Sequence, residues 1–153
     1  MTKNFDYLGN TFQIQLLNQI IVDKEFAQSI IDVLDPSYFD NKYFKLIIQM
    51  VKEYYQKYQS TPGFETLEQI SKAEISVELA LKIVLDTIKQ VQNAPFEGSV
   101  FVQEKALKFC KQQELQKVMN KAQKIIDQGD FESYDTVEGL VRTALQVGIR
   151  DGG

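Results

Sequence analysis

Hydrophobic residues recur at helical spacing along almost the whole chain. Between positions 41 and 59, for example, Phe44, Ile47, Ile48, Val51 and Tyr55 follow one another at intervals of three or four residues. This spacing places them on one face of an α-helix. The chain has no segment in which Val, Ile or Thr alternates with polar residues, as a half-buried strand would require. The pattern therefore predicts an all-α fold.

Turn signals divide the first part of the chain into a globular bundle of about five helices. The helices are expected at 10–22, 24–34, 41–59, 64–72 and 76–92. Asn10 or Thr11 is the expected N-cap of the first helix, and Ser76 that of the fifth. The helix at 41–59 is apolar around most of its girth, which predicts a central position.

Asp35 and Pro36 predict a tight bend before that helix, because Asp caps a helical turn and Pro suits its first position. Tyr38 and Phe39 would anchor the bend in the core. The residues up to position 10 are expected to form a loose leader.

The second part of the chain predicts a protruding antiparallel helical hairpin. A long helix can run from Ser99 to about Asp127, and Gly129 is placed to end it. A last helix is expected to begin at Tyr134 or Asp135, and a short polar turn between two helices makes an αα-hairpin. The predicted division is a head at 1–95, a hairpin at 96–147 and the start of a linker at 148–153.

The apolar face of the long helix changes sides near its middle. With about 100° per residue, Val102, Ala106, Phe109 and Cys110 lie on one side. The residues that follow on the other side are Leu115, Val118, Met119, Ala122, Ile125 and Ile126. Such a helix buries its halves against different bodies. Two short helices with a break near Gln112 and Gln113 would explain the same pattern.

Composition argues against chemistry in this chain. It has no His and one Cys, which removes the commonest general base and any cysteine cluster for a metal. No glycine-rich phosphate-binding motif occurs. We therefore expect no catalytic, cofactor-binding or metal-binding residues. The single Cys and the lack of a secretory or membrane-spanning segment favour the cytoplasm.

The charge balance disfavours tight binding to nucleic acid. The chain has 17 Lys and Arg against 21 Asp and Glu, and its only arginines are Arg142 and Arg150. The aromatic residues of 41–59 are expected in the core or half-buried, and the alternative is a platform for stacked bases. Lysines of the long helix are expected in solvent, and the alternative is a patch that attracts DNA or an acidic peptide.

The order of these features resembles the amino-terminal domain of DnaB-type replicative helicases, with the version from T-even-like phages nearest. The resemblance covers nearly the whole chain. The segments that carry it are FQIQLLNQIIVDKEF at 12–26, VLDPSYF at 33–39, the aromatic helix, Thr66-Leu67 after a Pro-containing break, Glu104-Lys105-Ala106-Leu107, and Ile125-Ile126 before an acidic turn. The hairpin has fewer arginines than is usual in the family.

The resemblance implies a non-catalytic domain that pairs subunits through hairpins, builds the collar of a hexameric ring, and docks primase. A helicase loader is a second candidate partner. The parent would be a helicase whose ATP and Mg are bound by a RecA-like motor beyond this fragment. The alternatives are a stand-alone helical adaptor or loader-like protein, and a weak single-stranded DNA-binding module.

We expect self-association through apolar residues of the hairpin. Two helices cannot cover all of them, and uncovered apolar surface is typical of a protein–protein interface. The predicted residues are Leu115, Val118, Ala122, Ile125, Ile126, Val137, Leu140, Val141 and Leu145.

Overall fold

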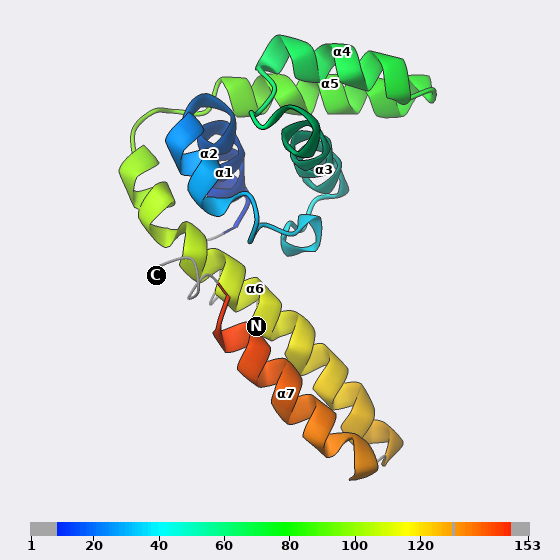
Figure 1. The fold of residues 1–153 in the computed structure, drawn as a ribbon. Helices are drawn as coiled ribbons and strands as arrows, with labels where there is room; N and C mark the ends of the chain where they lie inside the picture. The colour runs from blue at the N-terminus through cyan, green and yellow to red at the C-terminus, as the bar shows by residue number, and fades with distance from the viewer. Residues whose placement is uncertain (1–8, 130, 148–153) are drawn as a thin grey trace. The chain divides into compact units, whose positions relative to one another are not determined.

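The computed structural model describes residues 9–129 and 131–147, and these residues form helices and no strand (Figure 1). The all-α prediction is confirmed. The helices are α1 (Asn10–Val22), α2 (Lys24–Ile30), α3 (Lys42–Tyr58), α4 (Phe64–Glu74), α5 (Glu78–Gln92), α6 (Ser99–Gln128) and α7 (Tyr134–Leu145). Two short 3₁₀-helices, η2 (Pro36–Tyr38) and η3 (Phe131–Ser133), precede α3 and α7.

The chain divides into two compact units, Met1–Lys105 and Ala106–Gly153, and the boundary falls inside α6. The first unit contains α1 to α5, and the second contains the pair formed by α6 and α7. The sequence placed the boundary after residue 95, whereas the first residues of α6 belong to the first unit. Residues 1–8 of the expected leader and the expected linker at 148–153 lie outside the described residues, and Asn10, the last residue of that leader, already belongs to α1.

The observed N-caps confirm some of the predicted helix starts and contradict others. Asp35 caps η2 as predicted, because its Oδ1 accepts the backbone N–H of Ser37 at 2.8 Å. The predicted caps of α1 and α5 are wrong: Gly9 and Val77 occupy these positions, and neither makes a side-chain capping bond. Each helix begins beside a polar residue without using it as the cap. Helix α2 also ends four residues early, at Ile30.

Helix α1 is the helix that is buried on nearly every side. Its buried residues are Phe12, Gln13, Leu16, Leu17, Asn18, Gln19, Ile20 and Ile21. Helices α2, α3 and α5 all pack against it. Helix α3, which the sequence placed at the centre, buries a face that ends at Val51, and its last turns carry the more exposed Tyr54, Tyr55 and Tyr58.

Polar side chains of α1 connect it to segments far away in the sequence. The Asn18 side chain donates to the carbonyl of Val91 at 2.9 Å, near the end of α5. The Gln15 side chain donates to the carbonyl of Glu97 at 2.9 Å, in the turn between α5 and α6. The buried amide of Asn18 needs such a partner, because an unpaired buried polar group is costly. The Gln15 bond is exposed, and both bonds join α1 to the segment around the end of α5.

The carboxylate of Asp23 joins the start of α2 to α6. One oxygen accepts the backbone N–H of Phe26 at 3.1 Å, which caps α2, and the other accepts the Gln103 side chain at 3.0 Å. These two bonds, chiefly that from Phe26, lower the pKa of Asp23 from its ordinary value of 3.8. A lowered carboxyl pKa stabilises the fold above that value, and the stabilisation is lost as the pH falls through the folded-state pKa.

We predict that Asp23→Ala lowers the thermal midpoint of the chain at neutral pH, because α2 loses its cap and Gln103 loses a partner. The difference from the wild type should shrink as the pH falls below 3.8, where the wild-type carboxylate also becomes protonated. Circular dichroism melts across this pH range measure both effects. Asp32→Ala, at an exposed carboxylate just after α2, is the control. A difference that stays constant with pH would contradict the charge-dependent part of the cap.

Candidate self-association surface

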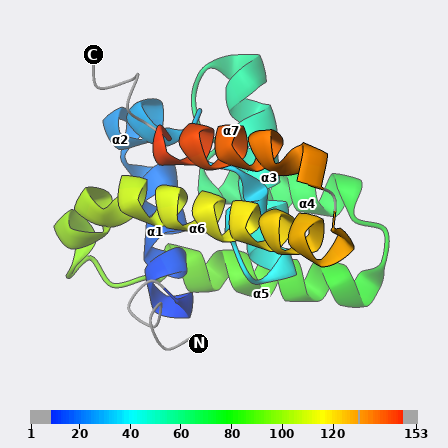
Figure 2. The ribbon, with the colours of Figure 1, turned by 90° about the horizontal axis from the view of Figure 1, so that it is seen from below.

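Helices α6 and α7 lie side by side and antiparallel in the second unit (Figures 1 and 2). Helix α6 is one continuous helix of 30 residues, so the alternative of two short helices is wrong. Gly129 follows its last residue with φ of +71°, a left-handed conformation that glycine adopts without strain. The turn then passes through η3 into α7.

The seam between the two helices contains part of the predicted set. With about 100° per residue, Val118, Ala122 and Ile125 share one face of α6. By the same geometry Val137, Leu140 and Ala144 share one face of α7. Val118 and Ala144 are buried, and the other four are half-buried. These residues are therefore used within the chain. Ala144 was missing from the predicted set.

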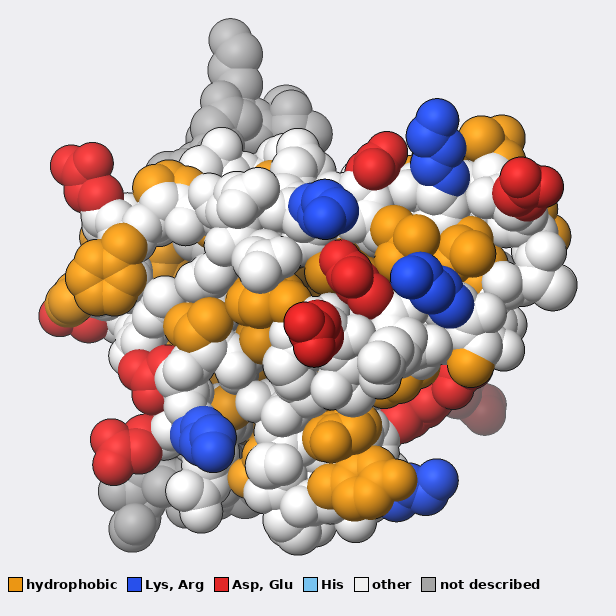
Figure 3. Space-filling model, turned by 90° about the horizontal axis from the view of Figure 1, so that it is seen from above, with side chains coloured by type: hydrophobic (Ala, Val, Ile, Leu, Met, Phe, Trp, Pro, Cys, Tyr) orange, Lys and Arg blue, Asp and Glu red, His pale blue; other side chains and the backbone are white. Residues whose placement is uncertain are grey.

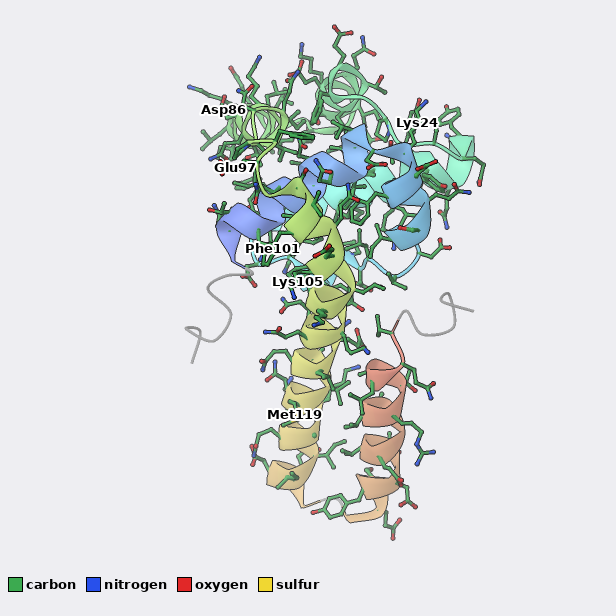
Figure 4. The ribbon with its side chains drawn as sticks, turned by 90° about the vertical axis from the view of Figure 1, so that its left-hand side faces the viewer. Lys24, Asp86, Glu97, Phe101, Lys105 and Met119 are labelled. Carbon is green, nitrogen blue, oxygen red and sulfur yellow. The ribbon has the colours of Figure 1, made fainter. Side chains whose placement is uncertain are left out.

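A second group of apolar side chains lies on the surface of the pair. Met119 and Ile126 on α6 are 60% and 55% exposed, and Tyr134 and Leu145 on α7 are 41% and 47% exposed. Figure 4 marks Met119 on the part of α6 beside α7. The sequence prediction included Ile126 and Leu145 but omitted Met119 and Tyr134. Met119 belongs to the same helical stripe as Ile126, seven residues away, and this spacing was the available signal.

These exposed residues share one face of the pair. On each helix, the exposed residues lie about a quarter turn around the helix axis from the residues of the seam. The rotation has the same sense on both helices when each is followed from its N-terminus to its C-terminus. Because the helices are antiparallel, equal rotations in this sense bring both sets to the same side. Val141, half-buried, lies between Tyr134 and Leu145 on this side. We call this surface the hairpin face: Met119, Ile126, Tyr134, Val141 and Leu145.

The predicted set therefore divides into three parts. Ile126, Val141 and Leu145 belong to the hairpin face. Leu115 is half-buried between the seam and this face. The remaining predicted residues are the seam residues Val118, Ala122, Ile125, Val137 and Leu140.

The opposite face of α6 is basic. By the same helical geometry Lys117, Lys121 and Lys124 lie on the side away from Met119. Lys117 forms an ion pair with Glu114 at 3.5 Å, one turn earlier on the same helix. Exposed pairs of this kind contribute little to stability. Helix α6 thus has one apolar face and one basic face.

Within residues 9–129 and 131–147, no group of three or more metal-binding side chains occurs, and no helix is long and apolar enough to span a membrane. Cys110 is buried and is not part of a disulfide. Comparisons with models of protein families, with curated proteins and with solved structures find no match. The function of the hairpin is therefore inferred from its own surface.

Two glycines of the hairpin provide a matched test of its structure. Gly139 lies within α7 and Gly129 in the turn, and a Cβ added at either meets nothing within 4 Å. Gly139→Ala should stabilise α7 by about 0.5–1 kcal/mol, because alanine loses less backbone entropy in a helix. Gly129→Ala should destabilise the turn by roughly 1–2 kcal/mol, because its conformation is left-handed. Amide hydrogen exchange in α7 measures both. Reduced protection in Gly139→Ala would show that this position is covered in solution.

Proposed function

We propose that this chain is a non-catalytic domain that self-associates through its hairpin face. The observation that carries this proposal is the exposure of Met119, Ile126, Tyr134 and Leu145 on one side of two ordered helices. Exposed apolar side chains that gather on one face often mark a protein–protein interaction site. A second copy of the same face is a suitable partner, because two antiparallel pairs can form a four-helix bundle.

The expected association is weak for the isolated chain. Burying a large apolar side chain completely gives about 1.5–3 kcal/mol, so each half-exposed residue supplies roughly 1 kcal/mol. Two copies would bury eight such side chains, on the order of 8 kcal/mol, against an association cost of about 4–15 kcal/mol. A dimer that forms only at high concentration follows from these magnitudes. Additional contacts in a larger ring would strengthen it.

We further propose that the parent protein is a DnaB-type replicative helicase of the cytoplasm. The sequence resemblance supports this proposal, and so does the succession of a helical unit and a helical pair. In that setting, the hairpins would pair subunits of a hexameric ring, and the domain would dock primase, with a helicase loader as a second candidate partner. ATP and Mg would act in the RecA-like motor of the parent. Co-sedimentation with the primase of the same replication system tests the docking role.

Two other functions would give different results. A stand-alone adaptor would use the hairpin face for a different protein and remain monomeric alone. A single-stranded DNA-binding module would use Lys117, Lys121 and Lys124, and its affinity would fall steeply with salt. Neither alternative requires the hairpin face to meet a copy of itself.

We predict that Ile126→Asp/Leu145→Asp abolishes concentration-dependent association and leaves the helical content unchanged. Both side chains lie outside the seam, so the pair can still form, whereas a carboxylate at a self-interface is buried without a partner. The contact is isologous, so each substitution acts twice in a dimer. Sedimentation over a concentration series up to the millimolar range measures association, with circular dichroism as the folding control.

The matched control is Asn120→Asp/Thr143→Asp, which adds the same charge on the same helices outside the hairpin face. It should associate like the wild type. Equal loss of association in both variants would point to net charge instead of this face. A wild type that stays monomeric at every concentration would refute self-association through the hairpin alone. Leu140 is a poorer probe, because it is half-buried in the seam.

A further inference from the structure

The first unit contains an open groove between α3 and α4. Its volume is about 580 Å³, and its residues come from the last turns of α3 and from one face of α4. They are Met50, Glu53, Tyr54, Gln56, Lys57, Tyr58, Thr66, Ile70 and Glu74. The structure uses none of them in the hairpin. This groove is therefore a second surface, independent of the hairpin face.

Two tyrosines form an aromatic wall of the groove. The rings of Tyr54 and Tyr58 are 4.5 Å apart between centroids and inclined by 45°. Tyr58 is 58% exposed, so its ring is not part of the core. Exposed tyrosine rings attract cations through their electron-rich faces. The sequence prediction placed these aromatic residues in the core or half-buried, and for Tyr58 this is wrong, because the groove leaves its ring open.

The floor of the groove is apolar and adaptable. Met50 is buried at its base, where the hydroxyl of Ser71 lies 3.8 Å from its sulfur. Ile70, on the facing helix, is half-buried. A flexible thioether beside an aliphatic side chain accepts apolar groups of different shapes. The floor thus suits the apolar side chains of a peptide.

The rim of the groove is acidic. Glu53 and Glu74 are exposed, and among the described residues neither forms an ion pair. Lys57 is the one cation in the lining. Helix α4 adds to this balance, because its eleven residues include three glutamates and one lysine. An acidic rim around tyrosine rings favours a cationic occupant and repels phosphate. Base stacking in this groove is therefore disfavoured.

The length of the groove matches a short helix. Its residues on α3 extend from Met50 to Tyr58, and those on α4 from Thr66 to Glu74. Eight residues of α-helix span about 12 Å, which corresponds to roughly two turns of a bound helix. Amphipathic helices commonly bind in grooves between two helices, with apolar anchors one turn apart.

We propose that this groove binds a basic amphipathic helix of a partner protein. Apolar side chains of that helix would contact Met50 and Ile70. Its lysine or arginine side chains would lie over Tyr54 and Tyr58 and pair with Glu53 and Glu74. This gives the docking part of the proposed function a surface and a chemistry. It depends neither on the hairpin face nor on the identity of the parent protein.

A nuclear magnetic resonance titration of the full chain tests the proposal with two designed helical peptides. Both peptides carry the same leucine face, and the polar positions are lysine in one and glutamate in the other. The lysine peptide should shift the signals of Met50, Tyr54, Tyr58 and Ile70. The glutamate peptide should bind at least about tenfold more weakly, because two charge pairs become repulsive.

Substitutions in the groove distinguish the contribution of its carboxylates to binding from that of its tyrosine rings. Glu53→Gln/Glu74→Gln should weaken binding of the lysine peptide by about fivefold, as expected for the loss of two exposed ion pairs. Tyr58→Leu keeps an apolar side chain but removes the ring. It should weaken binding of the lysine peptide by about threefold. Asp86→Asn/Glu97→Gln, which removes two carboxylates labelled in Figure 4 that do not line the groove, should have no effect.

Four results would overturn the proposal. They are equal binding of the two peptides, shifts confined to residues outside the groove, no binding of either peptide at millimolar concentration, and shifts of the groove signals by an oligothymidylate. The last result would favour single-stranded DNA. Sedimentation of the same samples reports the hairpin separately. Failure at the groove is thus distinguishable from failure of self-association.

Discussion

The burial of α1 on nearly every side is the constraint on which the first unit depends. A helix in this position would normally be apolar all round, yet α1 buries Gln13, Asn18 and Gln19 among its apolar residues. Each of these amides needs a hydrogen-bond partner inside the protein. Asn18 finds one at the end of α5 and Gln19 finds one in Gln103 of α6. These hydrogen bonds join α1 to the end of α5 and to the first turns of α6.

Helix α6 contributes residues to both compact units. Its first residues belong to the unit built around α1, and Gln103 is bound there by Gln19 and Asp23. From Ala106 onward it belongs to the pair with α7. Two helices share only one seam, so the pair covers Val118 and leaves Met119 at the surface. The hairpin face is a consequence of this geometry, and so is its availability for a partner.

The two candidate surfaces differ in the kind of partner that each can recognise. The hairpin face is apolar and suits a second copy of itself. The groove between α3 and α4 combines Tyr54 and Tyr58 with Glu53 and Glu74, so it selects for charge as well as for apolar contact. On the face of the molecule drawn in Figure 3, apolar, acidic and basic side chains lie next to one another.

The sequence by itself determined the helical class, the order of the helices and the hairpin turn. These depend on local spacing, on Pro36 and on Gly129, whose effects act over a few residues. The change of side in the apolar stripe of α6 was also visible, because one helix repeats about every 3.6 residues. The N-caps of α1 and α5 were mispredicted, since neighbouring polar residues compete for a boundary that packing decides.

Only the tertiary structure decided which apolar residues remain exposed. Leu140 and Leu145 have the same hydrophobicity and lie on the same helix, yet Leu140 lies in the seam and Leu145 on the hairpin face. The sequence likewise placed Tyr54 and Tyr58 on an aromatic helix that it predicted to be central, but it did not show that α4 lies beside them and leaves a groove. Exposure depends on which elements pack together, and contacts between residues far apart in the chain leave no local pattern.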